Sequence, residues 1–224
     1  LTSPYVYALA VSGGNLFAGT LGSVSYSPNQ GTWWSAHNIG LANTTVNCFA
    51  VTPAAGDTGG VNLFAGTSEG VLRSIDKAVT WSAVDIGLGN TNVVALAVGG
   101  QSLYAGTNGS GVWQRPLEEM ITPQHVWSWQ NPLPRWNDLR AVYAVDVHTL
   151  FAVGSFGTIM KTTDGGQTWL RQTSGTTVNL RSVWFTDASR GIAVGDSGTI
   201  LRTINGGATW SAAWAAPAPS ATAN

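Results

Sequence analysis

The chain has 224 residues, ten of them basic and eleven acidic, and carries a formal net charge of −1. So few cations argue against a surface that binds nucleic acids by neutralising their phosphates. With 44% hydrophobic residues and eleven tryptophans the chain can fill a sizeable core, which excludes disorder, and no apolar run approaches the roughly 20 residues of a membrane helix.

One short apolar element recurs along the chain, at residues 17–20, 64–67, 104–107, 151–154 and 192–195. Around each copy, Gly, Asn or Asp separates short apolar stretches about every 8–12 residues, and no long stretch keeps a helical period. Each repeat is therefore expected to form four antiparallel strands. These repeats predict an all-β fold, a five-bladed β-propeller with four strands per blade.

The repeat boundaries predict a single propeller domain over residues 1–214, with blades at approximately 4–40, 41–88, 89–134, 135–175 and 176–214. Residues 215–224 are rich in Ala and Pro and carry no charge, which predicts a disordered tail or a linker. The first repeat starts with its inner strand and the last ends with its outer strand, so no strand is shared across the seam of the ring. Blade 1 is then expected to meet blade 5 by side-chain packing, unless another chain completes the ring.

A turn motif with the pattern Ser/Thr-x-Asp-x-Gly-x-Thr-Trp occupies residues 162–169 and recurs with Asn for Asp at 203–210. Residues 74–81 keep most of the pattern, and residues 27–34 keep a degraded form. A short carboxylate or carboxamide accepts hydrogen bonds from N–H groups of its own turn, and the Trp can pack between sheets. The residues to which we assign these structural roles are Asn29, Asp76, Asp164, Asn205, Trp34, Trp81, Trp169 and Trp210.

The turn motif resembles the Asp-box, or BNR repeat, of sialidases and related propellers. Blades 4 and 5 also share Leu-Arg at 139–140 and 180–181, and Gly-x-x-Gly-Thr-Ile at 154–159 and 195–200. In these features they are similar to the propellers related to photosystem II stability and assembly factors. The resemblance implies a propeller whose boxes lie away from the usual ligand face, with an arginine patch near one end of the pore.

The candidate binding surface is the face that gathers the loops between blades and the turns between second and third strands. Arg140 and Arg181 occupy equivalent positions at the start of two inner strands. Two arginines beside a narrow pore can hold an anionic group by charge-assisted hydrogen bonds, although each can instead pair with a local carboxylate, such as Asp138 for Arg140. The candidate partner-binding residues are Arg140, Arg181, Arg135, Trp136, Asn137, Asn92 and Asn179.

The chemistry-bearing residues form no recognisable catalytic motif. The sialidases that carry Asp-boxes use an arginine triad, but no arginine precedes Arg73 in this chain, and the acids outside the boxes show no glycosidase-like pairing. Cys48 has no second cysteine for a disulfide, and the histidines lie at unrelated repeat positions. We therefore expect no catalytic site, no metal and no cofactor.

These features favour a non-catalytic binding or scaffold propeller that engages a protein partner through its loop face and pore mouth. A carbohydrate-binding propeller is the alternative, because tryptophans around the atypical third blade can either stack on sugars or pack that blade. These tryptophans are Trp113, Trp127, Trp129 and Trp136. A glycoside hydrolase-related domain is a third and less favoured interpretation. Few lysines and many small polar residues favour an exported protein, periplasmic or extracellular.

Overall fold

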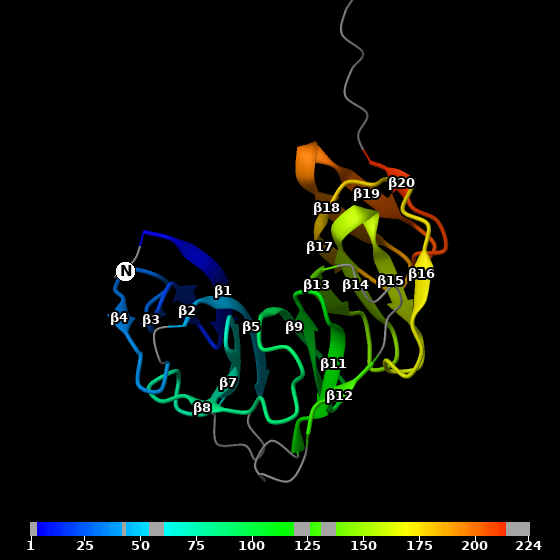
Figure 1. Cartoon of the computed structure of the whole chain (residues 1–224). Helices are drawn as coiled ribbons and strands as arrows, with labels where there is room; N and C mark the ends of the chain where they lie inside the picture. The colour runs from blue at the N-terminus through cyan, green and yellow to red at the C-terminus, as the bar shows by residue number, and fades with distance from the viewer. Residues whose placement is uncertain (1–3, 42–43, 54–60, 119–125, 131–137, 214–224) are drawn as a thin grey trace, which may run out of the picture.

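The computed structural model describes residues 4–41, 44–53, 61–118, 126–130 and 138–213, and in it each repeat folds into one four-stranded antiparallel sheet. The sheets follow one another along the chain, each with its strands in chain order. This arrangement confirms the predicted all-β fold of five four-stranded blades (Figure 1). No helix of the described residues has the length and apolar character needed to cross a membrane.

The strands of each blade run from the inner strand outwards. Blade 1 consists of β1 (Val6–Ser12), β2 (Asn15–Thr20), β3 (Ser23–Ser27) and β4 (Ser35–Ala36). Blade 2 consists of β5 (Val46–Pro53), β6 (Val61–Thr67), β7 (Gly70–Ser74) and β8 (Ser82–Ala83). Blade 3 consists of β9 (Val93–Gly99), β10 (Ser102–Thr107), β11 (Gly111–Pro116) and β12 (Ser128–Trp129).

The last two blades have a short 3-10 helix between their second and third strands. Blade 4 consists of β13 (Leu139–Ala144), β14 (Leu150–Gly154), η2 (Ser155–Gly157), β15 (Ile159–Thr162) and β16 (Leu170–Gln172). Blade 5 consists of β17 (Leu180–Phe185), β18 (Gly191–Gly195), η3 (Asp196–Gly198), β19 (Ile200–Thr203) and β20 (Ser211–Ala212). The expected tail at 215–224 lies outside the described residues.

The blades form an open arc. Figure 1 shows the inner strands β1, β5, β9, β13 and β17 on the concave side and the outer strands on the convex side. Neighbouring inner strands contact one another along the whole series. Blades 1 and 5 lie at the two ends of the arc (Figure 1), so within the described part of the chain the expected packing of blade 1 on blade 5 is not seen.

Each junction between successive blades has its own apolar core. Between blades 4 and 5, for example, Phe151 and Ile159 pack with Val183 and Trp210. A sheet in the middle of the arc is thus covered on both faces, which explains why its strands are apolar at nearly every position. The strand β14 is buried at all its positions, whereas the equivalent β18 of the last blade alternates between buried and exposed residues.

Candidate functional site at the pore mouth

The four boxes share one hydrogen-bond pattern. In blade 4 the Thr162 hydroxyl donates to Asp164 Oδ1 at 2.7 Å, and the same oxygen accepts the Thr168 N–H at 2.9 Å. The other three boxes make both bonds with their own Asp or Asn. Gly166 and Gly207 adopt φ values of +96° and +84°, a region that glycine enters without strain. The Asp or Asn side chain is therefore occupied in closing its own turn.

The tryptophans that end the boxes of blades 2, 4 and 5 pack between sheets. Trp81, Trp169 and Trp210 are buried, and their indole N–H groups have no hydrogen-bond partner among the described residues. Trp34 of the degraded first box is half-buried, and its indole Nε1 donates to the Gly31 carbonyl at 3.0 Å. Burial of the large indole surface links the boxes of blades 2, 4 and 5 to the preceding blade.

A β-bulge interrupts the inner strand of every blade at the same register. The bulge residues, in chain order, are Tyr7, Asn47, Val94, Arg140 and Arg181. A bulge leaves its residue out of the ladder and re-aims the side chain. The two arginines that the sequence places at equivalent positions are therefore also equivalent in structure, at the same end of neighbouring inner strands.

Arg181 is held by its own blade. Its Nε donates to Asp196 Oδ1 at 2.6 Å, and a second guanidinium nitrogen donates to Asp196 Oδ2 at 3.2 Å. The Asn179 amide adds a hydrogen bond to Asp196 Oδ2 at 3.1 Å. The bonds from Arg181 and then Asn179 lower the pKa of Asp196, and the carboxylate in turn raises the pKa of Arg181. The local-carboxylate alternative thus describes Arg181, with Asp196 as the partner.

Arg140 has a different environment because Ser155 stands in blade 4 where blade 5 has Asp196. The Arg140 Nε is buried and has no hydrogen-bond partner among the described residues. Asp138 instead faces the side-chain amide of Asn108. With this amide in its flipped orientation, the Asn108 nitrogen donates to the two Asp138 carboxylate oxygens at 2.8 and 3.1 Å. The charge of Arg140 also lowers the pKa of Asp196, although the Asp196 carboxylate is bonded to Arg181 and not to Arg140.

The comparison of blades 4 and 5 also shows which residues the sequence-based selection missed. Asp196 and Ser155 decide how each arginine is satisfied, yet both lie in turns that the sequence marks only as hairpin connections. The signal was present in the aligned repeats, where residues 154–157 and 195–198 differ at the second position. A carboxylate in one copy and a hydroxyl in the other predicts different partners for equivalent arginines.

The other candidate residues of the loop face are placed as follows. The Asn92 N–H donates to Asn90 Oδ1 at 2.9 Å, and the Asn92 carbonyl accepts the Asn108 N–H at 3.0 Å. Because Asn108 also faces Asp138, a chain of hydrogen bonds connects the segment before β9 with the start of β13. Candidates Arg135, Trp136 and Asn137 lie outside the described residues.

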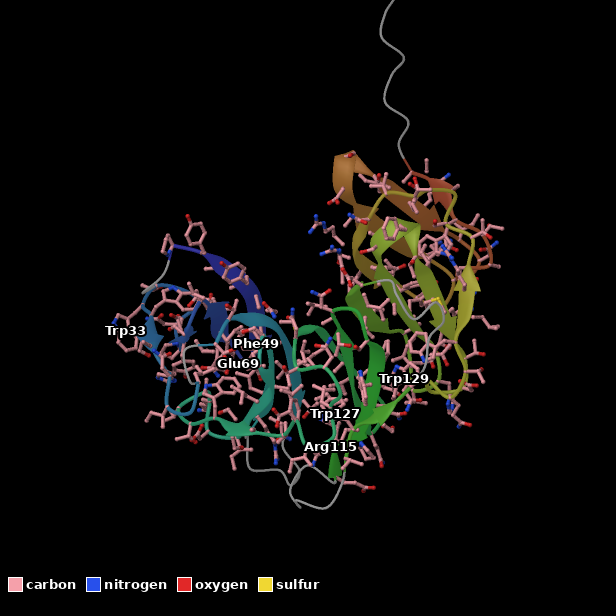
Figure 2. All side chains as sticks on the ribbon, in the orientation of Figure 1. Trp33, Phe49, Glu69, Arg115, Trp127 and Trp129 are labelled. Atoms are coloured by element: carbon pink, nitrogen blue, oxygen red, sulfur yellow. The ribbon has the colours of Figure 1, made fainter. Side chains whose placement is uncertain are left out.

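The described tryptophans of blade 3 have different environments, and Trp127 and Trp129 are labelled in Figure 2. Trp127 is buried and its Nε1 donates to the Val84 carbonyl at 2.7 Å, beside a 2.8 Å bond from Arg115 Nη1 to the same oxygen. Trp113 packs against the core between blades 2 and 3, and Trp129, its cross-strand neighbour, is 41% exposed. Two of these indoles therefore pack the blade that lacks a box, and Trp129 alone of the three is exposed.

An open pocket of about 290 Å³ lies along the inner strands of blades 2, 3 and 4. Its lining includes Val51 of β5, Leu96 of β9 and Val142 of β13. Arg140 does not line this pocket, whose residues on β13 begin at Val142, two positions further along the strand.

Neither Asp164 nor the Cys48 thiol suits catalysis. Hydrogen bonds from Thr168 and Thr162 lower the pKa of Asp164 to about 2, whereas a glycosidase acid needs a raised pKa. Burial raises the pKa of the Cys48 thiol to about 12, the opposite of what a nucleophile needs. Within the ranges that the structure describes, no three His, Cys, Asp or Glu side chains gather in a way that could hold a metal ion.

Residues 120–204 match the family model of the photosynthesis system II assembly factor YCF48. The fold is similar to that of YCF48 from Cyanidioschyzon merolae, with a TM-score of 0.62 and 16% identity, over 91% of this chain and 71% of that chain. It is also similar to YCF48 bound to D1 peptide, with a TM-score of 0.66 and 15% identity, over 95% and 69% of the two chains. A GH74 enzyme from Niastella koreensis gives a TM-score of 0.66 and 17% identity, over 93% of this chain and 37% of the enzyme. No curated protein matches the chain.

The sheets and the repeated box turns define this chain as a BNR-repeat β-propeller. Within that class, residues 120–204, the part of the chain that carries Arg140 and Arg181, are similar to YCF48.

Proposed function

We propose that this protein is a non-catalytic scaffold that holds a segment of a protein partner at the pore mouth, with Arg140 binding an anionic group of that segment. One observation carries the proposal: Arg140 has the position of Arg181 but lacks the carboxylate that neutralises Arg181. Arg140 is half-buried, and no carboxylate of the described residues bonds to it, so the exposed part of its guanidinium could form charge-assisted hydrogen bonds with a carboxylate of a bound peptide.

The surroundings of Arg140 support a peptide as the ligand. The pocket lined by Val51, Leu96 and Val142 on the same inner strands would take aliphatic side chains of the same peptide segment. A structure of YCF48 bound to D1 peptide has the same fold, and that relative's peptide complex supports a protein partner here as well. The acids of this chain that have lowered pKa values give no support to a glycosidase reaction.

Peptide binding by the pore mouth can be tested without knowing the partner. An array of short peptides with free terminal carboxylates would select a ligand, and fluorescence anisotropy would then measure its affinity for the full chain. Arg140→Gln should weaken binding by about 10- to 100-fold, because a hydrogen bond to a charged group contributes about 1.5–3 kcal/mol. Ser155→Asp should have a similar effect, since it would give Arg140 the partner that Arg181 has.

Matched controls separate this effect from a general change of charge or stability. Arg202→Gln removes an exposed arginine from blade 5, and Ser155→Asn changes the same turn without adding a charge. Neither control should change the affinity. Unchanged binding in both Arg140→Gln and Ser155→Asp would contradict the proposal. Saturable binding to a glycan array that is lost in Trp129→Ala, with no peptide binding, would support the carbohydrate alternative instead.

A further inference from the structure

The open face of blade 5 exposes residues whose equivalents are buried in blade 4. Ile192, Val194 and Ile200 are 45%, 37% and 38% exposed, while Phe151, Val153 and Ile159 at the same repeat positions have no exposed surface. Trp184, at the position of Tyr143, is 53% exposed. Blade 5 therefore carries a complete interblade face that the described part of the chain leaves without a neighbour.

Blade 4 shows what such a face binds. The ring of Phe185 stacks on Phe151 with centroids 4.3 Å apart, and Trp210 meets Phe151 edge-on at 6.3 Å. Tyr143 also stacks on Phe185 at 6.1 Å. The face of one blade thus takes an inner-strand aromatic residue and the box tryptophan of the next blade.

A polar contact accompanies this packing at three of the junctions. The hydroxyl of Tyr104 donates to the Gly165 carbonyl at 2.7 Å, and Lys161 Nζ donates to the Gly206 carbonyl at 2.7 Å. Between blades 1 and 2, His37 Nδ1 lies 3.1 Å from the Lys77 carbonyl. Each acceptor is the residue directly after the box Asp, or after the Asn of blade 5, with φ between +59° and +70°. A donor of one blade therefore recognises the box turn of the next.

Blade 5 exposes both parts of this recognition surface, the hydrogen-bond donor and the apolar face. Arg202 stands at the position of Lys161 and is exposed. Beside it, Trp184, Ile192 and Ile204 line a pocket of about 330 Å³, which is large enough for an aromatic side chain. We propose that this face is a docking site for an Asp-box blade of a partner polypeptide, whose box tryptophan enters the pocket and whose turn carbonyl accepts a hydrogen bond from Arg202.

A second copy of this chain is a less suitable occupant of the open face of blade 5 than a partner with fewer blades. The open face of blade 1 also exposes an interblade surface, with Leu9 and Val11 at the positions of Val183 and Phe185. Propellers usually close with 4–8 blades, and a second copy would bring the total beyond that range. The blades here cover 71% of the YCF48 chain from C. merolae, which leaves room there for about two more.

The test fuses blades of known sequence to the full chain. A second copy of residues 138–213 is appended after Asn224, so that tethering keeps it at high effective concentration. Oxidation of Trp184 by hydroxyl radicals should fall several-fold relative to the chain without the addition, and amide exchange in β18 should slow. Ile192→Asp or Arg202→Glu in the original copy should abolish this protection, and Ile75→Asp, an exposed position in blade 2, should leave it intact.

Three results would overturn the proposal. The first is no protection of Trp184 by the added blades. The second is protection that persists in both Ile192→Asp and Arg202→Glu. The third is self-association of the unextended chain in sedimentation velocity with Trp184 protected and with the association lost in Leu9→Asp, since a second copy would then be the occupant. The pore-mouth arginine plays no part in this test, so its outcome is independent of the peptide-binding proposal.

Discussion

Single residues in the repeats determine which hydrogen-bond partners the neighbouring side chains have. Arg140 and Arg181 occupy the same bulge, yet one neighbouring residue, Ser155 or Asp196, separates an arginine with a buried unpaired nitrogen from one in a bidentate ion pair. The Arg181 pair is more than half exposed on the arginine side, so it stabilises the fold only slightly. Its effect is to neutralise Arg181, whereas no carboxylate of the described residues bonds to Arg140.

Asp164 should make the stability of blade 4 sensitive to acid. Hydrogen bonds from Thr168 and Thr162 depress its folded pKa from 3.8 to about 2, so its contribution is present above the ordinary value and is lost as the pH falls towards 2. Asp164→Asn keeps the turn, as Asn205 does in blade 5. The difference in melting temperature between wild type and Asp164→Asn should therefore shift in favour of the variant as the pH is lowered from 5 to 2, a range set by these pKa values.

The reverse substitution provides the control for this titration. Asn205→Asp places a carboxylate in a turn with the same hydrogen-bond donors, and its melting temperature should acquire a new dependence on pH in the acid range. Equal acid sensitivity in wild type and Asp164→Asn would show that the box carboxylate does not contribute in this way.

The box of blade 2 contains a strained residue that glycine should relieve. Lys77 has a φ of +59° where the boxes of blades 4 and 5 have Gly165 and Gly206 at +70° and +64°. A left-handed conformation costs a residue with a Cβ about 1–2 kcal/mol, part of which is offset by the greater freedom of glycine in the unfolded chain. Lys77→Gly should raise the free energy of unfolding by about 0.5–1 kcal/mol in urea titrations. Lys77→Ala keeps the Cβ and should change it little; a stabilising effect of the same size would point to charge instead of strain.

At the scale of the elements, the junction between blades combines a broad apolar contact with one directional bond. Lys161 reaches across to the Gly206 carbonyl, and its ammonium group also lies 5.5 Å from the centre of the Phe151 ring. The bond fixes how the box of blade 5 sits on blade 4, which apolar packing alone would leave less defined.

Removal of this hydrogen bond should lower the free energy of unfolding only where a neighbouring blade is present. Lys161→Met keeps most of the side-chain stem and should lower the free energy of unfolding by about 1–2 kcal/mol, the usual range for a partly exposed hydrogen bond to a charged donor. Arg202→Met removes the equivalent side chain from the open face of blade 5 and should cost less than about 0.5 kcal/mol. Equal effects of the two substitutions in chemical denaturation would mean that Lys161 acts through its own blade.

The repeats, the four-stranded blades and the box turns follow from the sequence because their determinants are local. The Asp164 turn is closed by residues within four positions of it, and such contacts recur wherever the motif recurs. The hydrogen bonding of Arg140 is harder to predict, since it depends on a bulge and on a turn 15 residues away. The open arc is not specified by any single repeat, because each repeat carries both faces whether or not a neighbour covers them.

Over the residues that the structure describes, the molecule is a row of sheets in which the main contacts of each blade are with its neighbours, so its stability should be distributed like that of a repeat protein. Blade 3 has a core on each side, whereas blades 1 and 5 have one each. Local unfolding should therefore begin at the two ends of the arc and reach the middle last.

Hydrogen exchange followed by mass spectrometry should show this gradient directly. Amides of β9 and β10 in blade 3 should exchange most slowly, and those of β1, β2, β18 and β19 in the end blades should exchange earlier, although all belong to paired strands. Leu103→Ala, at a fully buried site of blade 3, should cost about 2–5 kcal/mol and speed exchange in the blades on both sides. Ile192→Ala, on the open face, should cost less than about 1 kcal/mol. Uniform protection across all the blades would show instead that the arc unfolds as one cooperative unit.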